Sequence, residues 1–444
     1  MSILTLNKLA LDLVARDFSD GHAASNGGPT KTARALAIIH LAAHDAYAAV
    51  AQGALTPLLP GLPPAPAKLA SDDATATTAL LSAGLRAATQ LYPDSASFIA
   101  DAATALINSA DPKALVYGDL VGDAWINARK GDGSGAPQSD TLYDTAPGRH
   151  RHDPLNPNQQ TLGRTWGFVR LFALNSVAAD APLMPPPMLD SAEYAVAYDD
   201  VFENGRNDIA ARSASYRQHA AIGTFWGYDG SNKLGTPPRL YNQVVVATSE
   251  LQGADHVTQI RVLTAINVAM ADAGIAAWYW KYQYDFWRPV VAIREADAGW
   301  GPSHIGDGNA LRSHAGDPFW LPLGAPTSNP QVAGAAAAPN GTPNFPAYPS
   351  GHATFGTACF ETAAALLGKT PETITVEFVS DEFNGKTTDN TGTARPVWAA
   401  EFTLREAIEQ NKVSRIYLGV HWAFDASGGE TVGHAVAQKV LQIF

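Results

Sequence analysis

The sequence predicts an all-α fold made of two helical bundles. Long Ala-rich stretches place apolar residues at the spacing of a helix, strand-like alternation is rare, and no repeat of fixed period is present. Of the 444 residues, 46% are hydrophobic and 16% are charged. This is enough apolar material for a sizeable core and too little charge for a disordered chain, and the length fits two domains.

The first 130 residues are predicted to be helical. A long loop follows from about Gly131 to Gln160, where Gly, Pro, Asn and Asp are frequent. A Pro cluster at 182–187 marks a boundary, so we expect a helical bundle over 1–190 and a second helical domain over 191–444. The helices predicted in the first half include 31–50, 73–92 and 95–108.

The second half alternates between helical segments and one long Gly- and Pro-rich loop. This loop is expected over 298–350, and the best candidate for a short strand is 372–380. The predicted helices are 191–203, 240–252, 256–288, 351–367, 397–418 and 421–442.

Composition excludes several classes of protein. With 30 basic and 42 acidic residues the formal net charge is −12, which would repel a nucleic acid. Cys359 is the only cysteine, so disulfides within the chain and Cys-based metal sites are excluded. No long uninterrupted apolar window predicts a membrane span, and the first 22 residues lack the pattern of a signal peptide. We therefore expect a soluble protein, either cytoplasmic or exported by a non-classical route.

The first of three notable stretches contains Lys281 and Arg288, followed by Pro289. Seven helical residues advance about 700°, so the two cations would lie within roughly 20° of one face and could grip an anion. Trp278 shares that face. Solvated surface cations are the alternative, but the surrounding aromatic residues suggest burial, and buried cations need anionic partners.

The second stretch is Pro349-Ser350-Gly351-His352, at the start of the predicted helix 351–367. Ser350 is a good N-cap, and the first helical turn presents backbone N–H groups to an anion. Gly351 allows a close approach to the backbone, and His352 is placed to exchange a proton. Taken alone, this stretch is better explained as an ordinary capped helix with a half-exposed histidine.

The third stretch runs from Ser414 to Asp425. Gly419 can end one helix and let His421 begin the next at a sharp corner. Asp425, four residues later, is adjacent to His421 and would fix its tautomer, while Arg415 offers a planar fork for an oxyanion. A helix-terminal His–Asp pair is the alternative for this stretch. Together, the three stretches predict a cationic cage around an oxyanion, with two histidines available for chemistry.

The motifs KxxxxxxRP, PSGH and SRxxxGxHxxxD, in this order, resemble the signature shared by vanadium-dependent haloperoxidases and the type 2 phosphatidic-acid-phosphatase superfamily. The resemblance covers about 215–444, and the second domain would then be the catalytic one. The flanking segments 225–232, 235–242 and 317–321 look like the fungal chloroperoxidase branch.

The resemblance implies a vanadate cofactor, for which phosphate could substitute, and a role for each motif residue. His421 would be the vanadium ligand, and His352 the acid–base group. Lys281 would also polarise peroxide. Asp229 would pair with the cage arginine Arg415, with Asp425 supporting His421. The residues that would bind vanadate are Lys281, Arg288, Ser350, Gly351, Arg415 and His421.

The implied reaction is the oxidation of halide by hydrogen peroxide to hypohalous acid, with an organic acceptor as a further candidate partner. Trp278 and Phe345 match the aromatic pair beside the cofactor in chloride-oxidising members of the family, so we expect a chloroperoxidase. The alternative is a phosphomonoester phosphatase with His421 as nucleophile and His352 as acid. A non-catalytic anion-binding protein is the third class, and the oligomeric state is left open.

Overall fold

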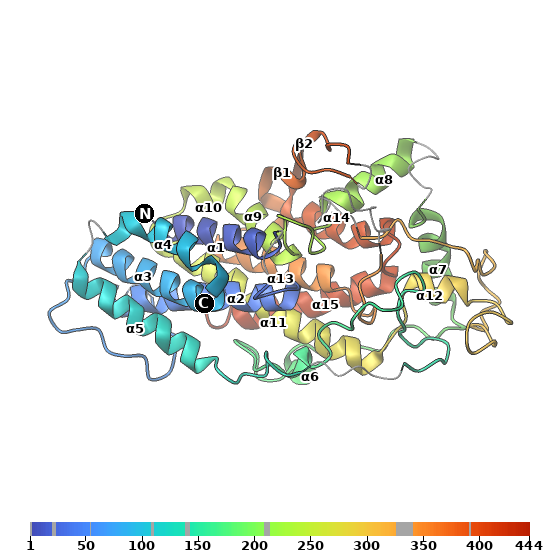
Figure 1. Ribbon diagram of the computed structural model, residues 1–444, viewed down its shortest axis with the longest axis horizontal. Coiled ribbons are helices and arrows are strands. Elements are labelled where there is room, and N and C mark those ends of the chain that lie inside the picture. Colours follow the sequence, from blue (N-terminus) through green and yellow to red (C-terminus); the bar gives the residue numbers. More distant parts are fainter. Residues whose placement is uncertain are drawn as a thin grey trace.

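The structure is a computed structural model. It describes residues 2–19, 24–53, 55–107, 111–137, 143–207, 214–325, 341–389 and 392–444. Most of these residues are helical or lie in long connecting loops, and the all-α fold class is confirmed (Figure 1).

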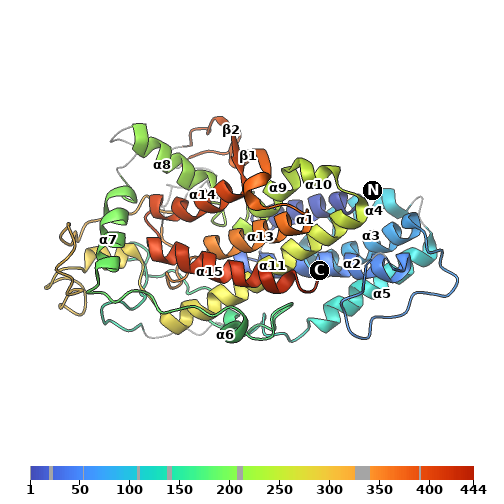
Figure 2. The same cartoon turned by 180° about the vertical axis from the view of Figure 1, so that it is seen from behind.

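The N-terminal helices form one end of an elongated molecule (Figures 1 and 2). Among them, α2, α3 and α5 pack against one another. The helices expected at 31–50 and 73–92 are confirmed by α2 and α3, and the helix expected at 95–108 is confirmed by α4 up to residue 107, since residue 108 lies outside the described residues. The bounds are α1 (Ile3–Asp17), α2 (Pro29–Ala51), α3 (Asp73–Leu91), α4 (Ala96–Ile107) and α5 (Pro112–Ala128).

The long helix α11 (His256–Tyr284) connects the two halves of the molecule. It packs against α2 on the N-terminal side and against α13 (Gly351–Leu366) and α15 (Ala423–Val440) on the C-terminal side. By length and composition α11 could cross a membrane, but 94% of its most apolar window is buried inside the protein. It is therefore the central core helix of this fold.

Shorter helices surround this centre. They are α6 (Val177–Asp180), α7 (Ala192–Asn204), α8 (Ala214–Phe225), α9 (Pro237–Ala247), α10 (Ser249–Gly253), α12 (Pro289–Arg294) and α14 (Leu404–Tyr417), with single turns at 93–95, 166–168 and 371–373. The helix expected at 240–252 is divided between α9 and α10, because Thr248 adopts an extended conformation and caps α10.

The helix expected over 256–288 ends earlier than predicted. Asp285 adopts a left-handed conformation (φ +50°) and stops α11, and Arg288 becomes the N-cap of α12. The expectation that Lys281 and Arg288 share one helical face is therefore wrong. Both cations still reach the same site, because the chain turns sharply between them.

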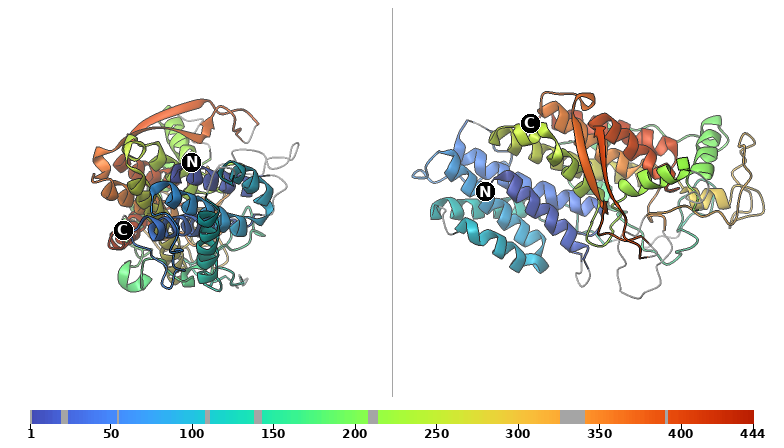
Figure 3. Two further views of the ribbon diagram at one scale, coloured as in Figure 1. Left: turned by 90° about the vertical axis from the view of Figure 1, so that its left-hand side faces the viewer. Right: turned by 90° about the horizontal axis from the view of Figure 1, so that it is seen from above.

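An antiparallel hairpin lies beside α8 and α9 (Figure 3). It consists of β1 (Thr375–Asn384) and β2 (Val397–Thr403), with Thr375 opposite Thr403. The strand expected at 372–380 is confirmed, but the helix expected from residue 397 is wrong over its first seven residues. Thr403 and Glu406 form a capping box that starts α14 only at Leu404.

Candidate active site

The three motif stretches converge on one buried site near the middle of the molecule. Lys281 comes from the last turn of α11, Arg288 from the start of α12 and Arg415 from the last turn of α14. All three side chains are buried, with relative exposures of 0%, 1% and 1%. Because buried charges are costly unless they are paired, the partners of each cation define what the site can bind.

Lys281 holds the backbone that leads into α13. Its Nζ donates to the carbonyl oxygens of Pro346, Ala347 and Pro349 at 2.9, 2.9 and 2.5 Å. These three contacts use all three N–H donors of the ammonium group. Burial, together with the nearby Arg288, lowers the pKa of Lys281 well below its usual value.

Arg288 lies between the aromatic wall of the site and His421. Its Nε donates to Phe345 O at 2.9 Å, and its Nη1 donates to Val420 O at 2.7 Å and lies 3.0 Å from His421 Nε2. Its buried Nη2 has no hydrogen-bond partner within the described part of the chain. Burial lowers the pKa of Arg288 to about 9, so the guanidinium is still charged at neutral pH.

Arg415 forms a two-pronged ion pair with Asp229. Nη1 and Nη2 each lie 3.0 Å from a different carboxylate oxygen, and this geometry fixes the plane of the guanidinium. Its buried Nε finds no partner among the residues that the structure describes. The expected pairing of Asp229 with the cage arginine is therefore present in the structure.

His421 is oriented by Asp425, as the sequence predicts. Its Nδ1 lies 2.7 Å from Asp425 Oδ2, which also accepts the backbone N–H of Trp422 at 2.9 Å. The carboxylate accepts the Nδ1 proton, so Nε2 carries the lone pair that Arg288 faces. Burial and the three nearby cations lower the pKa of His421 well below its usual value and keep the ring neutral.

The corner that positions His421 depends on Gly419. This residue follows the end of α14 with φ +70°, a conformation that favours glycine. A Cβ at this position would also collide with the backbone carbonyl oxygen of Gly205. The predicted role of Gly419 in ending the helix agrees with this geometry.

His352 faces the Asp229 side of the site. Its Nε2 lies 3.0 Å from Gly227 O and 3.7 Å from Asp229 Oδ1. Because a carbonyl oxygen can only accept, Nε2 carries the proton and Nδ1 is the basic nitrogen of the neutral ring. Burial and the charge of Arg415 lower the pKa of His352 to about 3.

Ser350 and Gly351 form the start of α13. Ser350 is the N-cap and accepts the backbone N–H of Ala353, and its own N–H donates to Asp425 O at 2.8 Å. The first turn of this 16-residue helix therefore directs backbone N–H groups into the same region as the cations.

Trp278 and Phe345 form an aromatic wall beside the cations. Their ring centroids are 4.9 Å apart, and Lys281 Nζ lies 5.6 Å from the Trp278 ring and 5.1 Å from the Phe345 ring. Both rings line the cavity. This arrangement lowers the local polarity around the cage.

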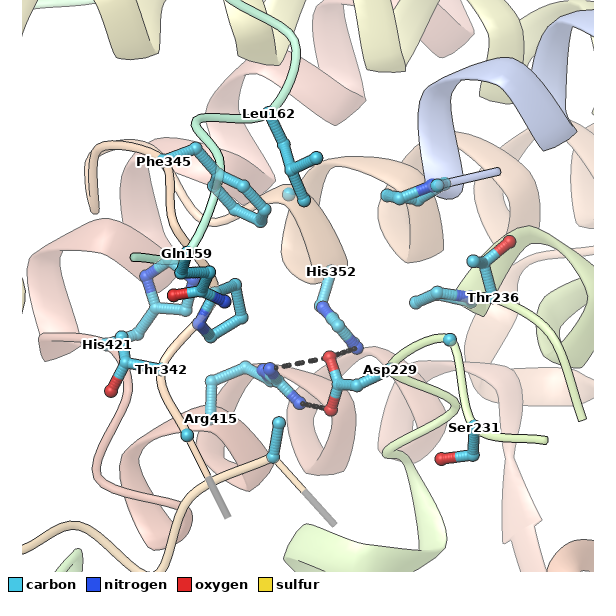
Figure 4. A pocket seen from close by; sticks show the side chains of 18 of the residues that line it. Gln159, Leu162, Asp229, Ser231, Thr236, Thr342, Phe345, His352, Arg415 and His421 are labelled. Atoms are coloured by element: carbon cyan, nitrogen blue, oxygen red, sulfur yellow. Dashed lines mark hydrogen bonds and ion pairs between the residues drawn. The ribbon is translucent and has the colours of Figure 1, made fainter. Parts of the chain in front are cut away.

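A cavity of about 500 Å³ opens onto the cage. Figure 4 shows Asp229 between Arg415 and His352, with Phe345 and Leu162 on the other side of the cavity. Sequence reasoning missed the part of the lining that comes from the N-terminal half, which consists of Phe18, Gly28, Pro29, Asn156, Gln159 and Leu162. These residues carry no local chemical motif, and only packing between the two halves brings them to the site.

His150 belongs to the tract Arg149-His-Arg-His152, for which the sequence favours a solvated loop, with an entrance to the active site as the lesser alternative. It lies in the predicted 131–160 loop, yet it is 2% exposed and its Nε2 is 3.2 Å from Asn344 Oδ1. Asn344 directly precedes Phe345 in the chain. Burial lowers the pKa of His150 well below its usual value, and the charge of the nearby Arg288 lowers it further.

The donor set of this site fits an oxyanion. Three buried cations face the same region, and the hydrogen-bond partners described for them include a single carboxylate, Asp229. Among the residues that the structure describes, Arg288 Nη2 and Arg415 Nε have no acceptor. Unpaired buried N–H groups of this kind cost free energy that an anionic ligand would recover.

A helical fold with two histidines inside a buried cationic cage defines an oxyanion-handling enzyme, and comparison with known proteins identifies its family. Residues 261–444 match the family of the VCPO second helical-bundle domain. The chain is 30% identical over 494 aligned positions to the vanadium chloroperoxidase of Curvularia inaequalis, with coverage of 91% of this chain and 76% of that protein. The chain therefore belongs to the vanadium haloperoxidase family, as its motifs predict.

Two solved structures support the same fold. A bacterial vanadium-dependent iodoperoxidase matches with a TM-score of 0.72 at 20% identity, covering 100% of this chain and 96% of that one. A holo-type bacterial vanadium-dependent chloroperoxidase matches with a TM-score of 0.64 at 18% identity, covering 94% and 93% of the two chains.

Proposed function

We propose that this protein is a vanadate-dependent haloperoxidase that uses hydrogen peroxide to oxidise chloride, and also bromide, to hypohalous acid. The observation that carries the proposal is a pair of buried donors, Arg288 Nη2 and Arg415 Nε, that have no acceptor in the described part of the chain and lie beside a neutral His421. An oxyanion would satisfy both features, because its oxygens can accept from the two arginine donors and its central atom can bind the neutral His421 nitrogen.

The residues that would hold vanadate come from the three motif stretches. Arg288 and Arg415 would donate to its oxygens, together with Ser350 and the Gly351 N–H at the start of α13. His421 Nε2 would be the single protein ligand. When bound, vanadate supplies a Lewis acid that activates peroxide without a change in its redox state.

Lys281 contributes to the proposed site in two ways. It adds a positive charge close to Phe345 and Trp278, which favours an anion in this region. It also fixes the carbonyl groups of 346–349, and so the position of the α13 start. Polarisation of peroxide by Lys281 would require one of these three carbonyl contacts to be exchanged.

His352 is the proposed acid–base group. The Gly227 carbonyl and Asp229 hold the protonated Nε2 and leave Nδ1 to accept and return a proton. The depressed pKa keeps this ring neutral across the physiological range, so that Nδ1 keeps a free lone pair. An anion in the cage would offset the charge of Arg415 and move the pKa of His352 upward.

The aromatic wall supports chloride as a substrate. Chloride is harder to oxidise than bromide, and an apolar boundary limits competition by water at the reacting position. Trp278 and Phe345 provide this boundary directly beside Lys281 and Arg288. The similarity to a chloroperoxidase over most of the chain supports the same preference.

A phosphatase is the second candidate, because the same cage fits a phosphoryl group. His421 is neutral, buried and aligned by Asp425, as a phosphoryl-accepting nucleophile must be. The aromatic wall and the similarity to a chloroperoxidase favour the haloperoxidase.

One parallel assay separates the two functions. Protein stripped of oxyanions would be supplied with vanadate, peroxide and chloride in one arm, and with a phosphate monoester in the other. We expect vanadate-dependent halide oxidation to dominate. Turnover of the monoester without vanadate-dependent oxidation would contradict the proposal and favour the phosphatase.

A further inference from the structure

The hairpin of β1 and β2 lies outside the cage, but it holds the segment that carries Asp229. Three contacts join β1 to residues 225–228. Ser380 Oγ donates to Phe225 O at 2.8 Å, and Asp381 N donates to the Tyr228 hydroxyl at 2.8 Å. Tyr228 N donates to Glu382 Oε1 at 3.3 Å.

The segment held by the hairpin has an unfavourable backbone conformation. Tyr228 is fully buried and has φ +45°, in the left-handed region that non-glycine residues rarely adopt. Such a residue persists where its surroundings determine its conformation. Here the hairpin supplies contacts to both the backbone N–H and the hydroxyl group of Tyr228.

Aromatic packing against the hairpin also holds this segment. Phe225 packs edge-to-face against Trp398 of β2, with a ring-centroid distance of 5.0 Å. Phe378 of β1 and Phe402 of β2 also pack edge-to-face against Phe225, at 6.1 and 6.2 Å. The hairpin therefore fixes the chain immediately before Asp229 through both polar and apolar contacts.

Glu382 is an unusual residue at this position. Its side chain is fully buried, and its Oε2 accepts from Arg395 Nη1 at 3.0 Å. Burial raises the pKa of Glu382 to about 8, so placing the charged carboxylate here costs free energy. The ion pair with Arg395 offsets part of this cost, and the other oxygen of the same carboxyl group accepts the Tyr228 N–H.

We propose that Glu382 and Arg395 form a positioning pair for Asp229. Glu382 accepts the Tyr228 N–H, and Arg395, two residues before β2 begins, forms an ion pair with Glu382. Asp229 then sets the plane of Arg415 and lies 3.7 Å from His352 Nε2. This inference rests on the proposed function, because it assigns the hairpin to the preparation of the oxyanion site.

A substitution in the hairpin should therefore alter oxyanion affinity although no cage residue is replaced. Outer partners of ligand-holding groups typically change affinity by about 10- to 100-fold when they are removed. We therefore expect Glu382→Ala to weaken vanadate binding by about 10-fold. Glu382→Gln keeps an oxygen for the Tyr228 N–H and should recover most of that loss.

The test is calorimetric titration of the oxyanion-free full-length protein with vanadate, and separately with inorganic phosphate. Glu377→Gln is the matched control, because Glu377 lies on the same strand, is exposed and faces Glu401. The melting temperature of each variant shows whether the substitution destabilises the fold. An affinity of Glu382→Ala equal to that of Glu377→Gln would overturn the proposal, even if its melting temperature were lower.

Arg395→Met keeps the test decisive if Glu382→Ala fails to fold. This variant retains the Glu382 oxygen but removes its ion pair, and we expect vanadate binding weaker than in Glu377→Gln. Equal affinity would refute the positioning role. Because binding is measured without halide or peroxide, a failure of halide oxidation in the wild type would leave this test unaffected. In active preparations, a lower kcat in Glu382→Ala with rescue in Glu382→Gln would support the same role.

Discussion

His421 Nδ1 and Asp425 Oδ2 lie 2.7 Å apart, and both side chains are buried at the start of α15. The same carboxylate oxygen accepts the Trp422 N–H, so the ring and the helix start are fixed together. This relationship leaves Nε2 as the basic nitrogen and aligns it with Arg288. It is the geometric basis for assigning His421 as the vanadium ligand.

Replacing Asp425 should therefore weaken the proposed vanadium site. We expect Asp425→Ala to lower vanadate affinity by about 10- to 100-fold, because the ring loses both its tautomer and its orientation. Calorimetric titration with vanadate provides the measurement. Glu430→Ala, on the more exposed side of α15, is the control and should bind as the wild type does. Wild-type affinity in Asp425→Ala would contradict the assignment.

Phe345→His should shift halide preference from chloride toward bromide. A polar imidazole would break the apolar wall that Phe345 forms with Trp278 and would add a titratable group beside Arg288. The measurement is the ratio of kcat/KM for the two halides. Phe345→Leu keeps the wall apolar and should retain the chloride preference, whereas an unchanged ratio in Phe345→His would remove the argument for selectivity.

The depressed pKa of His352 predicts a loss of stability in acid. Its folded pKa of about 3 lies below the ordinary value of 6.5, so the unfolded chain binds this proton first as the pH falls. The contribution is fully present above pH 6.5 and is lost as the pH falls toward 3. Between pH 7 and pH 5 we expect a loss of about 2 kcal/mol from this group.

Urea unfolding of the wild type and His352→Gln at both pH values provides the check. Other buried histidines such as His40, whose pKa burial lowers to about 4, make both proteins less stable in acid. The wild type should lose more free energy of unfolding than the variant does. Equal losses in the two proteins would contradict the burial of a neutral His352.

Asp272 should matter for stability more than for chemistry. This fully buried residue of α11 accepts the backbone N–H groups of Phe172, Ala173 and Leu174 at 2.8, 2.7 and 2.9 Å. Asp272→Ala would leave three donors without their acceptor, and we expect a loss of about 2–4 kcal/mol in the free energy of unfolding. Denaturant titration measures it. A loss below about 0.5 kcal/mol would show that these contacts do not hold the loop.

The sequence predicts the helices and the membership of the cage well, because capping, spacing and charge are local properties. It does not predict that Asp285 stops α11, since the aromatic residues after Lys281 continue a helical pattern. Residues 397–403 form a strand where the sequence predicts a helix, because their pairing with β1 depends on distant sequence. The division of the chain near residue 190 stays a prediction.

The lining from the N-terminal half could not be predicted for the same reason. Phe18, Pro29 and Leu162 reach the cavity only through packing of distant segments, and they carry no reactive group that would mark them. The burial of His150 similarly depends on tertiary contacts with Asn344. In each case the missing information is which distant segments meet, and spacing along the chain does not contain it.

The central claim is that the cage binds vanadate through His421, and an equilibrium titration of oxyanion-free protein with vanadate tests it most directly. The wild type should bind one equivalent, and His421→Ala should bind more than about 100-fold more weakly and lose halide oxidation. Wild-type affinity together with full halide oxidation in His421→Ala would contradict the account.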